Sequence, residues 1–179
     1  MQKNVVKVDG SELALKYGIG SLAAKYLQSM DLKEEQLNQL FHPFDSLHVN
    51  NAMCVIEACE RIKLAKQRGE KVFVAGDYDA DGIMSTCIMK ATLDRLGIRN
   101  GYYIPDRFKE GYGLSASTVE KVHAKGYSLI ITVDNGVKAH EALLKARELG
   151  IEVIVTDHHI IDEVEEANIV VHHDYMDTE

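Results

Sequence analysis

Three carboxylates lie within five residues of one another, at Asp77, Asp79 and Asp81, and Gly82 follows the last of them. Carboxylates this close together repel one another, and a bound cation is the natural explanation for keeping them together. Helix capping by an acid accounts well for one of the three and poorly for the whole set. The segment 76–82 is therefore predicted to hold a metal ion.

Three familiar loops fit this segment less well. An EF-hand calcium loop opens with the same D-x-D-x-D-G pattern, but it requires an acid where this chain has Ile88 and a helix where we expect a strand. A P-loop requires Gly-Lys followed by Ser or Thr, which the segment lacks. An aspartyl nucleophile of the haloacid dehalogenase type would leave the histidines further along the chain without a role.

The acidic segment follows an apolar run that is typical of a buried strand, and the same order recurs along the chain. Strands are predicted at 71–75, 101–104, 128–133, 152–156 and 168–171, and helices at 51–68, 83–96, 116–124 and 137–149. The runs 129–133 and 153–155 are continuously apolar, which is typical of strands covered on both faces. We therefore predict an α/β fold, with a mostly parallel five-stranded sheet flanked by helices and an N-terminal helical preamble.

Every predicted strand ends in acids, histidines or an arginine. The carboxyl ends of parallel strands meet at one edge of a sheet, where ligands bind. Besides the acids after the first strand, these residues are Asp106, Arg107, Asp134, Asp157, His158, His159, His172, His173 and Asp174. Their common position predicts one shared site.

Mixed Asp and His ligands suit Mn²⁺, Mg²⁺ or a similar ion better than metals that prefer sulfur. Two such ions, about 3.5–4 Å apart and bridged by a carboxylate, would activate water and stabilise charge on a phosphoryl centre. Arg107 would form paired hydrogen bonds with phosphate oxygens. We interpret His172 and His173, in contrast, as a polar turn near the end of the chain.

The composition limits the class of protein. A net charge of -8 disfavours a surface built as a whole to bind nucleic acid, but metal-site carboxylates add to this count and a nuclease is not excluded. Cys54, Cys59 and Cys87 lack C-x-x-C spacing, so we expect three small buried side chains in a reducing cytoplasm and no disulfide framework. No stretch has the length or pattern of a membrane span or signal peptide, and no membrane partner is expected.

Four motifs stand in order along the chain: Gly-Asp-Tyr-Asp-Ala-Asp-Gly at 76–82, Pro-Asp-Arg-Phe-Lys-Glu-Gly-Tyr-Gly-Leu at 105–114, Val-Asp-Asn-Gly at 133–136 and Val-Thr-Asp-His-His at 155–159. They resemble the four N-terminal motifs of the DHH phosphoesterase superfamily. The second motif resembles in particular the RecJ branch, the 5′→3′ exonucleases specific for single-stranded DNA in repair and recombination. The resemblance implies hydrolysis of a phosphodiester by metal-activated water and release of 5′-mononucleotides.

The resemblance also implies roles for individual residues. Two Mn²⁺ or Mg²⁺ ions would be held by Asp77, Asp79, Asp134 and His158. Asp134 would bridge the two ions, and His158 would bind the second one. Two residues would face the scissile phosphate, namely His159 and Arg107. Two would orient the groups around it, namely Asp81 and Asp157.

By the same resemblance, 51–179 is a DHH-type catalytic domain behind a preamble at 1–50, and single-stranded DNA is its partner in a longer chain. Ala75 departs from the family pattern, since some relatives carry a histidine there near the first metal. In the family, a further metal-binding Asp lies farther along the chain than the position of Asp174, and a C-terminal domain beyond it binds the substrate. We therefore expect a catalytic half that a C-terminal domain or a partner chain completes.

Two other functions remain open from the residues. One is a phosphodiesterase of the same superfamily that acts on short oligonucleotides or cyclic dinucleotides. The other is a catalytically idle scaffold for partner binding, which has no need to keep mutually repelling carboxylates together. The second motif favours the RecJ-like exonuclease over the phosphodiesterase, and the intact acids and histidines speak against the scaffold.

Overall fold

The computed structural model describes residues 9–41, 52–106, 113–161 and 166–175. The chain divides into two compact units, Met1–Val49 and Asn50–Glu179, and each is described by itself. None of the helices in the described ranges is both long and apolar enough to cross a membrane.

Short helices make up the described part of the first unit. They are α1 (Ser11–Tyr17), α2 (Ser21–Ser29) and α3 (Glu34–Phe41). The Tyr17 ring stacks on Phe41 with ring centroids 4.4 Å apart, and its hydroxyl donates a hydrogen bond to Asn38 Oδ1 at 2.9 Å. These contacts join the first helix to the third. The predicted helical preamble is therefore confirmed, and its helices carry none of the predicted site residues.

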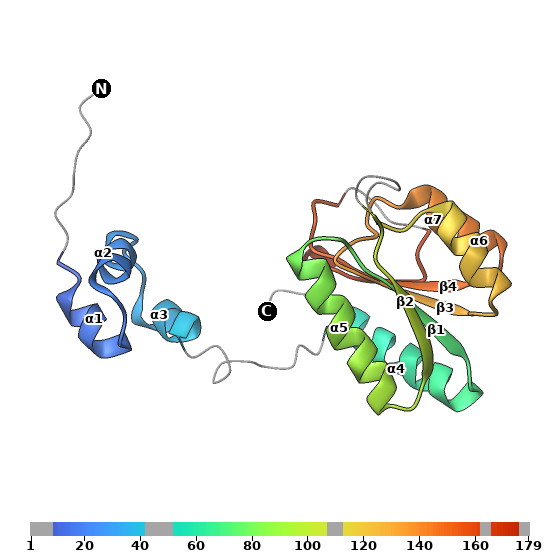
Figure 1. Cartoon of the computed structure of the whole chain (residues 1–179), viewed down its shortest axis with the longest axis horizontal. Coiled ribbons are helices and arrows are strands. Elements are labelled where there is room, and N and C mark those ends of the chain that lie inside the picture. Colours follow the sequence, from blue (N-terminus) through green and yellow to red (C-terminus); the bar gives the residue numbers. More distant parts are fainter. Residues whose placement is uncertain (1–8, 42–51, 107–112, 162–165, 176–179) are drawn as a thin grey trace, which may run out of the picture. The chain divides into compact units, whose positions relative to one another are not determined.

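The second unit is built on a parallel five-stranded sheet with the strand order β2-β1-β3-β4-β5 (Figure 1). The strands are β1 (Lys71–Ala75), β2 (Arg99–Tyr103), β3 (Leu129–Val133), β4 (Glu152–Thr156) and β5 (Ile169–Val171). The predicted α/β class and its five-stranded parallel sheet are thus confirmed. The strand order reverses between β1 and β3, because β2 and β3 lie on opposite sides of β1. Ligands of such sheets bind at this switch point, beyond the carboxyl ends of the strands.

Helices cover both faces of the sheet (Figure 1). They are α4 (Met53–Arg68) and α5 (Ala80–Arg95) on one face, and α6 (Ala116–Ala124) and α7 (His140–Glu148) on the other. Alternate residues of β1 serve the two cores: Val72 and Val74 pack toward α4 and α5, and Phe73 and Ala75 pack toward α6 and α7. β3 is buried along its whole length, which explains its continuously apolar sequence.

Three helices begin at residues other than the predicted ones. α4 begins at Met53, two residues late, with Ala52 as its N-cap. α5 begins at Ala80, three residues early, because the Asp79 side chain caps it and accepts two backbone N–H groups of its first turn. α7 begins at His140, three residues late, because residues 137–138 form a turn that the backbone N–H of Ala139 closes onto Gly136 O at 3.0 Å. α6 begins after Ser115, which caps it through the backbone N–H of Thr118.

Two expectations of detail are wrong. β2 begins at Arg99 and not at residue 101, because Arg99 pairs in parallel register with Lys71 at the start of β1. Cys59 and Cys87 are exposed and not buried. Both cysteines follow a helix residue that takes the inward position, so their own side chains face outward.

Arg61 ties α4 to the sheet at the edge opposite the strand exits. It is 8% exposed, its Nε donates to Glu152 Oε2 at 2.7 Å, and its Nη2 donates to Glu70 Oε2 at 2.7 Å. Ser128 Oγ donates to the same Glu70 oxygen at 3.0 Å. Burial by itself would raise the pKa of Glu70, but the hydrogen bonds from Arg61 and Ser128 outweigh it and lower that pKa. The cluster joins α4 to the starts of three strands.

The substitution Arg61→Ala should lower the free energy of unfolding by about 3 kcal/mol, because it removes two hydrogen bonds between charged groups and leaves the half-buried Glu70, among the described residues, with only the longer ion pair to Arg68, at 3.6 Å. Lys63→Ala removes an exposed ion pair from the same helix and is the matched control, with no measurable effect expected. Urea unfolding followed by circular dichroism measures both. Equal effects of the two substitutions would contradict the assigned role of Arg61.

Candidate metal centre

The acids after β1 meet the acid after β3 at the switch point, because these two strands are parallel neighbours. Asp77, Asp79 and Asp134 each bring a carboxylate oxygen to within 4.8 Å of the other two. An open cleft of about 510 Å³ extends from here along the carboxyl ends of β3, β4 and β5. The described residues that line it are Asp81, Ser85, Asp134, Thr156, Asp157, His158, Val171, His172 and His173.

Asp77 is the most deeply buried of the three carboxylates, with 1% of its surface exposed. Its Oδ1 atom has no hydrogen-bond partner among the residues that the structure describes. Burial first, and then the nearby charge of Asp79, raise the pKa of Asp77. A buried acceptor without a donor costs about 1–3 kcal/mol. A hard cation would satisfy this oxygen, so the residues present fit a metal ion.

Glycines allow the acidic loop to fold closely against α5. A Cβ atom on Gly82 would lie 2.6 Å from the Cβ atom of Asp77, and one on Gly76 would lie 2.0 Å from Thr86 Oγ1. Real Cβ atoms do not approach other atoms this closely, so a side chain at either position would push the loop away from the helix. The glycines of the first motif therefore set the depth of Asp77.

Asp79 caps α5 and also faces the other carboxylates. Its Oδ1 accepts hydrogen bonds from the backbone nitrogens of Asp81 and Gly82, both at 3.0 Å. These bonds, the one from Gly82 first, lower the pKa of Asp79, and a hydrogen bond with the Asp134 carboxyl lowers it further. The capping role that explains one of the three acids thus belongs to Asp79.

Asp134 is held in an uncommon backbone conformation. Its φ is 61°, in the left-handed region that residues other than glycine rarely adopt. The backbone N–H of Asp134 donates to Thr156 O at 3.0 Å. The next residue, Asn135, is fully buried and donates its amide to Ala75 O and Val133 O, both at 2.9 Å. This amide bridges β1 and β3 and sets the direction in which Asp134 leaves the sheet.

Asp134 is electrostatically coupled to both halves of the site. Burial and the charge of Asp79 raise its pKa, while the neighbouring His158 opposes that shift. His158 Nε2 lies 2.8 Å from Asp134 Oδ1. One ligand atom each from Asp134, His158 and His159 also fall within 4.8 Å of one another. Asp134 therefore belongs to two groups of potential metal ligands, as a bridging residue would.

Asp157 holds the histidine segment. Its Oδ1 accepts from the backbone nitrogens of His158 at 2.7 Å and His159 at 3.1 Å, and lies 2.7 Å from His159 Nδ1. Its Oδ2 accepts from Val137 N at 3.1 Å. Burial alone would raise the pKa of Asp157, but these donors outweigh burial and lower it. Because an ionised carboxylate can only accept, His159 Nδ1 carries the proton.

The predicted site residues fall into three groups. Asp77, Asp79, Asp134, His158 and His159 lie together around Asp134. Asp81 and Asp157 line the cleft without joining a group of potential metal ligands, and Asp157 contacts both histidines. Arg107 lies outside the described residues.

Sequence reasoning missed two buried residues of this edge, Asn135 and His172. The interpretation as a polar turn suits the exposed His173 but is wrong for His172, which is 1% exposed. Asn135 lies inside the third motif, so its place next to Asp134 was the available signal. No local pattern signals the burial of His172, because it results from contacts with a loop thirteen residues away in sequence.

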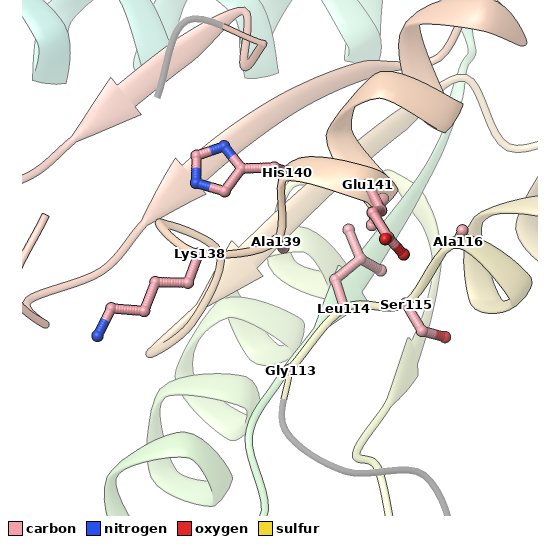
Figure 2. A pocket seen from close by; sticks show the side chains of 10 residues that line it. Gly113, Leu114, Ser115, Ala116, Lys138, Ala139, His140 and Glu141 are labelled. Atoms are coloured by element: carbon pink, nitrogen blue, oxygen red, sulfur yellow. The ribbon is translucent and has the colours of Figure 1, made fainter. Parts of the chain in front are cut away.

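A separate cavity of about 410 Å³ lies between the start of α6 and the start of α7 (Figure 2). It is lined by 113–116, Gly136 and 138–142. Figure 2 shows the side chains of Lys138 and His140 extending away from Ser115 and Ala116. His140 Nδ1 lies 3.2 Å from Glu166 Oε2. None of the predicted metal ligands is among the described lining residues, so the candidate metal centre lies at the open cleft and not in this cavity.

Comparisons with known proteins agree with this geometry. The model of the DHH family, N-terminal domain, matches residues 71–178. The single-stranded-DNA-specific exonuclease RecJ of Bacillus subtilis is 53% identical over 104 residues, which cover 58% of this chain and 13% of that protein. RecJ of Escherichia coli is 47% identical over 107 residues, which cover 59% of this chain and 18% of that protein. The chain thus spans less than a fifth of the length of these two relatives.

Solved structures give the same result. A crystal structure of exonuclease RecJ bound to manganese matches with a TM-score of 0.65 and 37% identity, covering 70% of this chain and 32% of that one. RecJ from Thermus thermophilus in complex with Mn²⁺ matches with a TM-score of 0.66 and 29% identity, covering 94% of this chain and 24% of that one. Since the family model covers more than half of the sequence, the chain belongs to the DHH family through the N-terminal domain at residues 71–178.

Proposed function

We propose that this chain is the catalytic half of a metal-dependent phosphoesterase, a RecJ-like 5′→3′ exonuclease that acts on single-stranded DNA. The observation that carries the proposal is that carboxylate oxygens of Asp77, Asp79 and Asp134 lie within 4.8 Å of one another. Among the described residues, the buried Oδ1 of Asp77 has no hydrogen-bond partner. Similarity to RecJ enzymes, including two solved with manganese, supports the substrate class and the metal. Residues 51–179 would form the catalytic domain and 1–50 its helical lead-in.

Asp77, Asp79, Asp134 and His158 would hold two Mn²⁺ or Mg²⁺ ions, with Asp134 as the shared ligand. When bound, the ions supply Lewis-acid stabilisation of the phosphoryl oxygens and lower the pKa of the attacking water. The chain supplies the fixed positions. The two sheet cores hold β1 and β3 side by side, so the carboxylates need little rearrangement when the ions bind.

His159 would contact the scissile phosphate or the group that leaves it. A ligand atom of His159 lies within 4.8 Å of ligand atoms of Asp134 and His158, and a positive charge on its ring would oppose the raised pKa values of Asp77 and Asp134. Because Nδ1–H donates to Asp157, contact with substrate would be made through Nε2. Arg107, which lies in the second motif, would bind phosphate oxygens. Asp81 would orient groups at the mouth of the cleft.

The negative net charge of the chain fits the catalytic part of a longer nuclease better than a complete nuclease. With a net charge of -8, the chain as a whole is repelled by the phosphates of a DNA backbone. The strand-gripping surface would lie in the part of the longer relatives that this chain does not span. Single-stranded DNA would therefore be a substrate mainly in that longer context.

The direct test is an assay of the chain with Mn²⁺ on single-stranded DNA labelled at its 5′ end, beside a duplex and a dinucleotide. We expect Mn²⁺ binding with slow release of 5′-mononucleotides from the single strand only. Faster hydrolysis of the dinucleotide would favour the small-substrate phosphodiesterase. Absence of Mn²⁺ binding at low micromolar concentration would contradict the proposal and favour the idle scaffold.

Asp134→Asn should reduce the number of bound Mn²⁺ ions from two to at most one, because a neutral amide bridges ions poorly. Asn tolerates the left-handed backbone, and removing one charge relieves repulsion, so the melting temperature of the metal-free protein should rise. Asp31→Asn is the matched control, since Asp31 also has a left-handed φ, of 50°, but lies in the N-terminal unit. Calorimetric titration and thermal unfolding measure both effects. Unchanged stoichiometry in Asp134→Asn would show that Asp134 does not bridge.

The affinity for Mn²⁺ should rise with pH, and Mn²⁺ binding at acidic pH should release protons from the protein. Asp77 and Asp134 have pKa values raised above the ordinary 3.8, so each keeps its proton to a higher pH than an exposed aspartate. Ions bind the ionised carboxylates, so protons are displaced in this window and the effect disappears above it. Calorimetry in two buffers with different ionisation enthalpies counts the protons. If Mn²⁺ binding released more protons at about pH 7.5 than at about pH 5, the result would contradict this expectation.

A further inference from the structure

His172 leaves β5 toward the cleft and is 1% exposed, whereas the next two residues, His173 and Asp174, are exposed. The strand before it is only half-buried, so His172 is the most buried residue of this part of the edge. A buried imidazole needs partners for both of its nitrogen atoms. The role of His172 can therefore be inferred from those partners.

Both ring nitrogens of His172 have a hydrogen-bond partner. Nε2 lies 2.8 Å from the carbonyl oxygen of His159, and because a carbonyl oxygen can only accept, Nε2 carries the proton. Nδ1 then bears the lone pair and accepts from the backbone N–H of Asp174 at 3.2 Å. The partners thus assign the Nε2–H tautomer.

The bond to the His159 carbonyl completes a clamp on the histidine segment. On one side, Asp157 holds the backbone N–H and the Nδ1–H of His159. On the other side, His172 holds the carbonyl of the same residue. The segment between them carries His158, whose side chain is 64% exposed and whose Nε2 reaches Asp134 Oδ1. The backbone N–H of His158 donates to the same Asp157 oxygen at 2.7 Å, so both histidines of the segment depend on the clamp for their position.

We propose that His172 is a positioning residue of the metal centre, which holds His158 and His159 in place opposite Asp134 through its Nε2–H bond to the His159 carbonyl. This inference rests on the proposed function, because it assigns His172 a task in the metal centre proposed above. His172 would act without touching the ions. It would do so by fixing the peptide from which a ligand and a phosphate-facing histidine project.

A different role for the same residues is a metal site of their own. Ligand atoms of His172, His173 and Asp174 lie within 4.8 Å of one another. The two rings, however, are only 31° from parallel with centroids 4.2 Å apart, so the lone pairs in their planes do not converge on one point. The Nδ1 atom of His172 also already accepts a hydrogen bond. The geometry therefore favours positioning over metal binding.

Two substitutions of similar size separate these roles. His172→Gln places an amide N–H where Nε2–H stands and loses the Nδ1 lone pair, whereas His172→Leu fills the space without a donor. We expect His172→Leu to weaken binding of the second Mn²⁺ ion about ten-fold, the low end of the usual effect of losing such a support. His172→Gln should bind Mn²⁺ like the unsubstituted chain.

A metal-free readout keeps this test independent of the proposed function. In the metal-free protein, amide hydrogen exchange at His158 and His159 should be faster in His172→Leu and normal in His172→Gln. Failure of the unsubstituted chain to bind Mn²⁺ would contradict the proposed function, while the exchange rates would still report on the clamp. Equal exchange in all three proteins would overturn the positioning role. Equal loss of Mn²⁺ in both variants would overturn it in favour of a ligand at Nδ1.

Discussion

Repulsion among the carboxylates of Asp77, Asp79 and Asp134 is the constraint on which the carboxyl edge of the sheet depends. Each carboxylate is kept in place by a different part of the fold. Gly82 allows Asp77 to lie against α5, the cap of α5 fixes Asp79, and the amide between β1 and β3 directs Asp134. Because packed cores on both faces hold these strands, the carboxylates stay close together, and a bound cation would offset their charge.

The opposite pKa shifts of two neighbouring aspartates show how the fold divides tasks at this edge. Asp77 is buried with an oxygen that lacks a partner in the described structure, and its pKa is raised. Asp157 is buried among N–H donors from His158, His159 and Val137, and its pKa is lowered. The first arrangement leaves ligand capacity for an ion, and the second uses that capacity to orient histidines. Burial alone would have made the two residues alike.

Most residues of the candidate site could be predicted from sequence, but not which of them lie next to one another. Continuous apolar runs such as Leu129–Val133 indicated buried parallel strands, and parallel strands place their exits on one edge. Nothing in the local pattern states that β1 lies beside β3, which is what joins Asp77 to Asp134. The burial of His172 was missed for the same reason, because a distant carbonyl causes it. The start of α5, in contrast, depends on a local contact, because the Asp79 side chain caps the helix.

Electron paramagnetic resonance of the chain titrated with Mn²⁺ tests the central claim most directly, because it reports the distance between two ions without depending on hydrolysis. Two ions that share the Asp134 carboxylate would lie about 3.5–4 Å apart. We predict that the spectrum of isolated Mn²⁺ gives way, as the second ion binds, to that of an exchange-coupled pair. A spectrum of isolated ions at saturation would contradict a shared centre at the junction of β1 and β3.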